Sequence, residues 1–143
     1  MKTIIFVGSN PSKKNKNPNI AFVGSSSEKT LDQWEEIICW KLYYKTKEDF
    51  QIHSMNISNR VKSSQTGFKF TKQELQIFQD WLLETKNLTL VCLGKKVHDA
   101  IKKMNTNGHR VIEFLHPSPR NRKLNDKKLV SKELKRLLKE VTK

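Results

Sequence analysis

Polar side chains that could do chemistry directly follow several apolar stretches of this sequence. The clearest is His116, which ends one such stretch and precedes PSPRNR at residues 117–122. The two prolines restrict the backbone of this segment, and its two arginines carry guanidinium groups that bind phosphate well. A stiff loop that joins a histidine to guanidinium groups suits contact with a phosphate backbone.

A second candidate is Asn10, in the stretch GSNPS at residues 8–12. Gly8 allows a sharp turn after the preceding apolar stretch, and Pro11 fixes the direction of the exit. Between them, the Asn10 side chain offers one hydrogen-bond acceptor and two donors. The stretch is not a phosphate-binding P-loop, because the second glycine is missing. Ordinary turns also use Asn and Pro, so these residues alone leave both interpretations open.

Asn56 stands at the end of a third, more polar stretch, residues 51–57. Burying an amide in a strand costs free energy unless the amide is paired, and the edge of a nucleic-acid base would be a suitable partner. The alternative is a turn-forming asparagine at the end of a strand.

Two further positions have less specific signals. Gly94 and Lys95 follow another apolar stretch, where a strand turns into a helix whose N-terminus could lie near a phosphate. Phe22 lies in a segment rich in Ser, Asn and Lys. Its ring either covers a pocket or packs against a sheet.

The elements that must position these residues alternate between strands and helices. The predicted strands cover residues 3–8, 51–57, 88–94 and 110–116. Three of them are nearly continuous apolar runs, as buried parallel strands are. The alternation predicts an α/β fold of three layers, with helices on both faces of a mostly parallel four-stranded sheet. Such sheets bind ligands at the carboxyl ends of their strands, where the candidate residues stand.

The helices are predicted from start signals and apolar spacing. Thr30 with Gln33, and Thr71 with Glu74, form possible capping boxes ahead of two apolar stripes. Two later helices are indicated by apolar residues at helical spacing: Val97, Ala100, Ile101 and Met104 in one, and Leu134, Leu137, Leu138 and Val141 in the other.

The charge of the chain indicates a polyanionic partner. The formal net charge is +14, and residues 101–143 carry 13 basic and 4 acidic side chains. A basic surface concentrated in one third of a small protein favours nucleic acid as the partner. The alternative is a surface that is merely solvated by many lysines.

Length and composition exclude several other classes. A chain of 143 residues with 36% hydrophobic residues is expected to form one globular domain, 1–143. No apolar stretch approaches the roughly 18 residues of a membrane span, and the apolar start is too short for a signal peptide, so we expect a cytoplasmic protein. Cys39 and Cys92 are too few for a metal cage, and both are expected to be buried thiols. His53, His98 and His109 lack metal-ligand spacing and are expected at the surface or in turns. We expect neither a metal nor a cofactor.

Taken together, the motifs resemble the uracil-DNA glycosylase superfamily. HPSPRN at residues 116–121 is similar to the histidine motif of the single-strand-selective monofunctional branch. GSNPS resembles the G-x-N-P-G motif of that branch and of the mismatch-specific branch. Phe22 and Asn56 fall about where the family has its base-stacking Phe and base-reading Asn, and LVCLGKKVHDAI at residues 90–101 resembles the family's strand, glycine and helix. The resemblance spans about residues 3–122.

The resemblance implies a monofunctional DNA glycosylase of base excision repair that acts on a base flipped out of single- or double-stranded DNA. His116 would donate a hydrogen bond to the base oxygen where charge develops, and Asn10 would position the attacking water. The implied base-binding residues are Gly8, Ser9, Ser12, Phe22 and Asn56. The implied DNA-binding residues are Ser118, Pro119, Arg120, Asn121, Arg122 and Lys95, with Arg120 or Asn121 probing the gap left by the base. The protein is expected to act as a monomer without a membrane partner.

Departures from the family pattern affect the expected activity. The fastest branch has Asp at the position of Asn10, and an amide cannot accept a proton at neutral pH, so a slower enzyme is expected. That branch also has a Tyr that excludes the methyl group of thymine, whereas Ser12 leaves room here. Uracil, thymine, hypoxanthine and modified cytosine therefore all stay candidate bases. The iron–sulfur branches are excluded, because two cysteines cannot supply four ligands.

Two other hypotheses stay open. One is a glycosylase-like module that binds DNA or a modified base without turnover. The other is a different enzyme on a doubly wound sheet, such as a nucleotide-processing enzyme, because such sheets host many functions. The HPSPRN motif gives no support to the latter.

Overall fold

The computed structural model describes residues 2–10, 27–47, 50–60, 68–118 and 121–143. At its centre is a sheet of four parallel strands in the order β2-β1-β3-β4. The strands are β1 (Lys2–Gly8), β2 (Phe50–Asn56), β3 (Leu88–Leu93) and β4 (Arg110–Phe114). The four predicted strands are therefore confirmed, with ends that differ by at most two residues.

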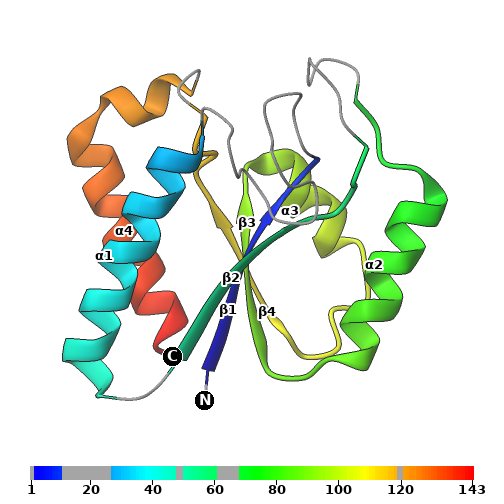
Figure 1. Ribbon diagram of the computed structural model, residues 1–143, viewed down its shortest axis with the longest axis horizontal. Helices are drawn as coiled ribbons and strands as arrows, with labels where there is room; N and C mark the ends of the chain where they lie inside the picture. Colours follow the sequence, from blue (N-terminus) through cyan, green and yellow to red (C-terminus); the bar gives the residue numbers. More distant parts are fainter. Residues whose placement is uncertain (1, 11–26, 48–49, 61–67, 119–120) are drawn as a thin grey trace.

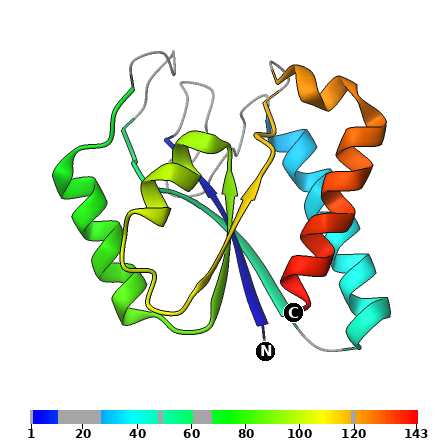
Figure 2. The same ribbon diagram turned by 180° about the vertical axis from the view of Figure 1, so that it is seen from behind.

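Helices cover both faces of this sheet (Figures 1 and 2). One face carries α1 (Glu28–Thr46) and α4 (Lys127–Val141), and the other carries α2 (Lys72–Glu84) and α3 (Lys95–Lys102). A short 3-10 helix, η1 (Arg122–Asn125), precedes α4. The predicted three-layer α/β fold is confirmed, and the sheet is parallel throughout.

The continuous apolar run in β1 serves both layers of the core. Side chains alternate between the two faces of a strand, so Ile4 and Phe6 pack under α1 and α4, whereas Ile5 and Val7 pack under α2 and α3. Because both faces of β1 are covered, its residues contact apolar neighbours on either side.

The two predicted helix starts have different outcomes. At α2, Thr71 Oγ1 accepts from Glu74 N (3.1 Å) and Glu74 Oε1 accepts from Thr71 N (2.9 Å), which confirms the capping box. The predicted start of α1 is wrong, because the helix begins at Glu28 and Thr30 lies inside it, whereas its predicted apolar stripe is buried. The bond from Leu31 N to Ser27 O (3.1 Å) closes an earlier first turn, where the acidic Glu28 interacts favourably with the helix dipole.

One prediction of burial is wrong. Cys39 is exposed, because it lies one residue past the stripe of α1 that faces the sheet, whereas Cys92 is buried as expected. His109 was expected at the surface or in a turn, and its backbone N–H does close a turn on Thr106 O (2.8 Å), but its side chain is buried and its Nδ1 accepts from Leu88 N (3.1 Å). None of the helices in the described ranges is long and apolar enough to cross a membrane.

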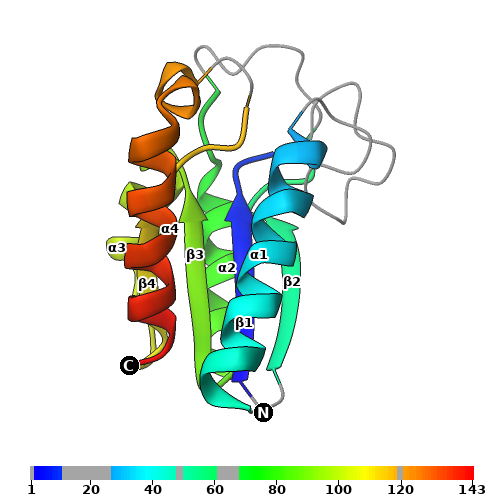
Figure 3. The ribbon, with the colours of Figure 1, turned by 90° about the vertical axis from the view of Figure 1, so that its left-hand side faces the viewer.

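The carboxyl ends of the strands and the two chain ends lie at opposite ends of the molecule (Figure 3). All four strands run in the same direction, so the segments that follow them gather at one edge of the sheet. That edge holds the residues that the sequence singles out.

Candidate active site

The carboxyl edge of the sheet brings the main predicted residues together. Gly8, the last residue of β1, pairs with Asn56, the last residue of β2, and Asn10 follows directly. On the other side of β1, β3 ends before Gly94 and β4 ends before His116. Neighbouring strands are about 4.8 Å apart, so the edge from β2 to β4 spans roughly 14 Å.

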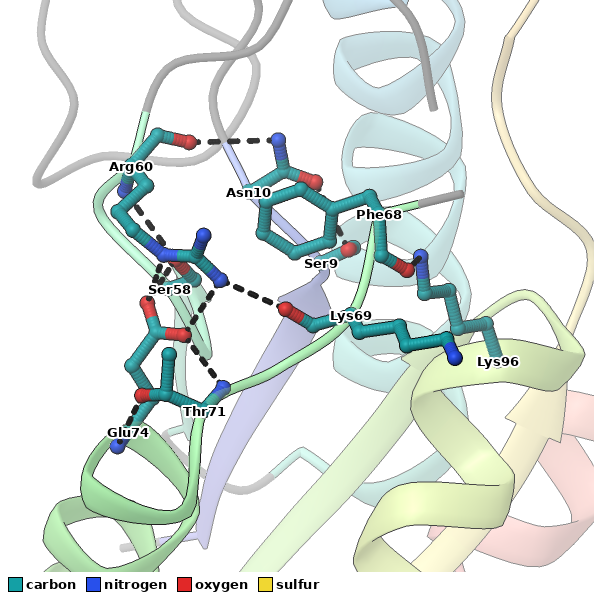
Figure 4. Close-up of polar contacts among 9 residues, drawn as sticks. All are labelled: Ser9, Asn10, Ser58, Arg60, Phe68, Lys69, Thr71, Glu74 and Lys96. Carbon is teal, nitrogen blue, oxygen red and sulfur yellow. Dashed lines mark hydrogen bonds and ion pairs between the residues drawn. The ribbon is translucent and has the colours of Figure 1, made fainter. Parts of the chain in front are cut away.

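Asn10 is buried and held from two sides (Figure 4). Its Oδ1 accepts a hydrogen bond from Ser9 Oγ (2.9 Å), and its Nδ2 donates to the backbone carbonyl of Arg60 (3.3 Å). A backbone bond from Ser58 N to Ser9 O (2.9 Å) continues the pairing of the two segments beyond the strands. The amide of Asn10 is therefore part of a fixed polar edge.

Asn56 has the least satisfied side chain at this edge. Its exposed fraction is 8%, and neither Oδ1 nor Nδ2 has a hydrogen-bond partner within the described ranges. Each unpaired buried polar group costs about 1–3 kcal/mol, and such groups in native proteins call for an explanation. A ligand with a donor and an acceptor side by side would satisfy both amide atoms.

His116 is poised as a neutral hydrogen-bond donor. Its Nδ1 accepts a hydrogen bond from the backbone N–H of Ser118 (3.0 Å). A ring nitrogen that accepts carries no proton, so the neutral ring has its proton on Nε2. Burial lowers the pKa of His116 below its ordinary value, which favours this neutral form further.

Gly94 supports the imidazole ring of His116. Its φ is +97°, a conformation open mainly to glycine. A Cβ at this position would lie 3.3 Å from Cδ2 of His116, and Gly94 N donates to Phe114 O (3.0 Å). The sequence predicts the turn at Gly94 but not this packing, because the contact joins two different strand ends.

Asn121 closes the loop that follows His116. Its Nδ2 donates to the carbonyl oxygen of His116 (3.0 Å), and its Oδ1 accepts from Lys123 N (3.2 Å) at the start of η1. Its backbone N–H donates to Ser118 O (2.9 Å). The Asn121 amide thus shapes the loop, and its predicted contact with DNA stays a prediction.

A groove of about 760 Å³ lies beside β4 and includes His116, Asn121 and Lys95 in its wall. Arg136 of α4 also lines the groove, and it donates to the Glu113 carbonyl of β4 (2.7 Å) and to Glu133 Oε2 (2.7 Å). Three predicted site residues therefore share one concave surface.

The other predicted residues fall into two groups. Lys95 and Arg122 are exposed near this end of the molecule, and Gly8 and Ser9 lie at the end of β1. Four predicted residues lie outside the described ranges: Ser12, Phe22, Pro119 and Arg120. Their roles stay predictions.

A polar cluster beside Asn10 was not predicted from the sequence (Figure 4). Arg60, which follows β2, forms an ion pair with Glu74 of α2, with 2.8 Å between Arg60 Nη2 and Glu74 Oε1. Hydrogen bonding to Arg60, and then to Ser58, holds the pKa of Glu74 at about 2. The only sequence signal was the capping box, which accounts for Glu74 but not for its bond to Arg60.

Metal ligands do not gather in the described ranges, where no cluster of three or more His, Cys, Asp or Glu could hold a metal ion. The polar groups at the edge are mainly amides and one imidazole. They are suited to hydrogen-bonding a neutral, planar polar ligand.

Comparison with known families decides the relationship. The family model of the uracil DNA glycosylase superfamily matches residues 2–140. The chain belongs to this superfamily. No curated protein and no solved structure shows a significant match to the chain.

Membership of the uracil DNA glycosylase superfamily confirms the predicted relationship and agrees with the parallel α/β sheet. The match extends beyond the motifs at residues 8–12 and 116–121 and includes most of α4. Because the superfamily acts on DNA, a glycosylase type of function follows in general terms.

Proposed function

We propose that this chain is a monofunctional DNA glycosylase, which hydrolyses the N-glycosidic bond of uracil, or of a base with a similar edge, flipped out of DNA. The observation that carries the proposal is the buried, unpaired amide of Asn56 at the same edge as Asn10 and the neutral His116. A flipped base would supply the missing hydrogen bonds.

Asn56 is proposed to recognise the Watson–Crick edge of the base. Uracil presents an N–H donor next to a carbonyl acceptor, and the Asn56 Oδ1 and Nδ2 atoms can pair with both. Thymine and hypoxanthine share this arrangement and belong to the same substrate class. A base that cannot pair leaves the buried amide unsatisfied, which is an effective source of discrimination.

His116 is proposed to stabilise the leaving base. When the bond from the sugar C1′ to the base nitrogen breaks, its electron pair stays on the base and the sugar becomes cationic. The Nε2–H of a neutral His116 can donate to the base carbonyl where this charge gathers. One preorganised donor of this kind lowers a barrier by about 3 kcal/mol.

Asn10 is proposed to orient the water that adds to C1′. Its Oδ1 is an acceptor of hydrogen bonds and not a base at neutral pH. The proton of the added water therefore passes to solvent, and we expect slow turnover.

The remaining predicted residues are proposed to bind the base and the DNA around it. Phe22 would stack on the flipped base, Ser12 would leave space beside it, and Gly8 and Ser9 would let the backbone approach it. Ser118, Pro119, Arg120, Asn121, Arg122 and Lys95 would contact the DNA backbone or the gap left by the base. The high positive charge supports binding to a phosphate backbone.

The test is a cleavage assay on labelled oligonucleotides with one uracil opposite G, opposite A or unpaired. Base loss is revealed by alkaline cleavage of the abasic site, and a monofunctional enzyme leaves the strand intact without alkali. We expect His116→Ala to lower the single-turnover rate about 10²- to 10³-fold, and Asn56→Ala and Asn10→Ala to lower it as well. His53→Ala, which changes an exposed histidine of β2, is the control and should keep the wild-type rate.

The second candidate is a DNA-binding module without turnover, which the amide at Asn10, in place of a carboxylate base, permits. Salt-sensitive DNA binding without release of uracil, thymine, hypoxanthine or modified cytosine would favour this candidate and overturn the proposed mechanism.

A further inference from the structure

We propose that the Arg60–Glu74 ion pair is a positioning device for Asn10, an inference that rests on the proposed function. The pair fixes the Arg60 carbonyl, and this carbonyl decides which end of the Asn10 amide turns toward it (Figure 4). Arg60 and Glu74 are therefore positioning residues, which act on the reaction through Asn10.

Arg60 contacts Asn10 directly, although the two residues lie 50 positions apart in the chain. A backbone carbonyl only accepts hydrogen bonds, so the end of the Asn10 amide that faces it at 3.3 Å is the Nδ2–H donor. This choice orients the Oδ1 atom away from Arg60, on the side where Ser9 Oγ donates to it at 2.9 Å. The carbonyl therefore disfavours a reversed amide, which would bring Oδ1 against another acceptor and present the wrong end to a water.

Arg60 is itself fixed by several hydrogen bonds. Its guanidinium donates to both carboxylate oxygens of Glu74, at 3.1 Å from Nε and 2.8 Å from Nη2. The same Nη2 donates to the Lys69 carbonyl at 2.7 Å. The backbone N–H of Arg60 donates to Ser58 Oγ at 3.1 Å, and that hydroxyl donates to Glu74. Backbone and side chain of Arg60 are thus fixed to the same carboxylate.

The residues around the Arg60–Glu74 ion pair are held by the starts of α2 and α3. Glu74 belongs to the first turn of α2, where it closes the capping box with Thr71. On the other side, the Arg60 guanidinium carbon lies 4.7 Å from the centroid of the Phe68 ring, and Lys96 of α3 lies at the same distance from that ring. Lys96 also donates to the Phe68 carbonyl. The device therefore links Asn10 to the starts of two helices.

A role in stability alone accounts poorly for this arrangement. The Arg60 side chain is 50% exposed and that of Glu74 is 16% exposed, so solvent screens part of the attraction and the ion pair contributes only modestly to the stability of the fold. A small shift of a group that orients a reactant, in contrast, can lower a rate up to 100-fold. The pair is therefore expected to affect turnover more than folding.

The test is a double-mutant cycle between Glu74 and Asn10, measured as the single-turnover rate of base release and as the Kd for DNA. Glu74→Gln keeps a residue that can close the capping box but removes the charge that fixes Arg60. We expect this variant to lower the rate about 10-fold and to change the Kd less than twofold. Because Glu74 acts only through Asn10, the same change in an Asn10→Ala background should lower the rate no further.

The matched control is Glu140→Gln, which removes the carboxylate of the Lys143–Glu140 pair (3.0 Å) on α4. This control should keep the wild-type rate. Arg60→Lys, which keeps the charge but loses the two-pronged guanidinium, should fall between wild type and Glu74→Gln.

The outcomes separate the inference from the proposed function. No base release by the wild-type protein overturns the proposed function and this inference with it. Base release by the wild type that is unchanged in Glu74→Gln, or lowered equally with and without Asn10, overturns the inference alone. A rate loss that disappears in the Asn10→Ala background, with Kd unchanged, supports it.

Discussion

Single polar side chains at the carboxyl edge are kept in states that cost stability. Asn56 is buried without hydrogen-bond partners for either amide atom, and partial burial lowers the pKa of the His116 imidazole. Such costs persist in proteins where the same groups serve binding or catalysis. Two predictions follow from the energetics of these two residues.

Replacing Asn56 with an apolar residue of similar size should stabilise the protein and abolish base release. Asn56→Leu removes two unpaired polar atoms, so the free energy of unfolding should rise by about 1–3 kcal/mol. Denaturant unfolding and the oligonucleotide assay measure the two effects on the same preparation. A less stable variant would show that the amide is satisfied in the folded protein, against the role proposed for it.

His116 should make stability depend on pH below neutrality. Because burial lowers its pKa, the unfolded chain, with an ordinary value of about 6.5, binds the proton more strongly than the folded protein. The stability linked to this group is therefore fully present above pH 6.5 and is lost as the pH falls through the lower, folded pKa. We expect the melting temperature to drop more between pH 7 and pH 5 in the wild type than in His116→Gln.

The difference between the wild type and His116→Gln gives the contribution of the histidine alone. Burial and the nearby Asp32 raise the pKa of Glu35 to about 6, which acts in the opposite direction over part of the same range. That contribution is the same in both proteins and cancels in the difference. If the melting temperature changed equally with pH in the two proteins, folding would not lower the pKa of His116.

The turns after the strands, one level above single residues, set the geometry of the site. Gly94, between β3 and α3, combines a positive φ with close packing on the imidazole of His116. Gly108, ahead of β4, also has a positive φ (+77°), but a Cβ there would meet nothing within 4 Å. Both glycines have a strained backbone conformation, but only Gly94 contacts the site.

Alanine substitutions at these glycines should both lower stability but should have different effects on activity. Both Gly94→Ala and Gly108→Ala place a Cβ on a strained backbone, at a cost of about 1–3 kcal/mol each. Only Gly94→Ala pushes on His116, so only this variant should lose rate after correction for the folded fraction. Thermal unfolding and single-turnover kinetics measure both, and equal rates in the two variants would contradict a supporting role for Gly94.

The elements themselves could largely be predicted from the sequence, because apolar periodicity and capping signals are local. The strands and the capping box at Thr71 are examples, and the parallel topology then places Asn10, Asn56 and His116 at one edge. The contacts that tune these residues are not local. The bond from Asn10 to the Arg60 carbonyl joins segments 50 residues apart, and no spacing rule predicts it. The early start of α1 was missed because no capping box marks it: Ser27 is the N-cap but its side chain makes no capping hydrogen bond to the first turn.

The positive charge is a property of the whole molecule, and it should make DNA binding depend on salt. Every phosphate that a cation neutralises releases a counterion, so log K falls linearly with log salt concentration. Lys95→Ala and Arg122→Ala, both near the carboxyl edge, should each reduce the magnitude of this slope by about 1.

Lys143→Ala is the matched control, since the C-terminus lies at the opposite end of the molecule (Figure 1). It removes one charge without removing a proposed phosphate contact. Fluorescence anisotropy over a range of salt concentrations measures all three slopes. Equal slopes for the three variants would mean that the charge acts only as a diffuse field.

The central position of β1 has a consequence for how the chain is made. Lys2 pairs with Phe50 and Thr3 pairs with Leu88, so β1 leaves the ribosome before both of its neighbours and must wait for them. Pairings so distant in sequence form slowly, and newly made domains fold as units once enough chain is available. Until β3 has been synthesised, the apolar run from Ile4 to Val7 has an open side. The carboxyl edge of the sheet would be completed only when His116 has been made, long after Asn10 has left the ribosome.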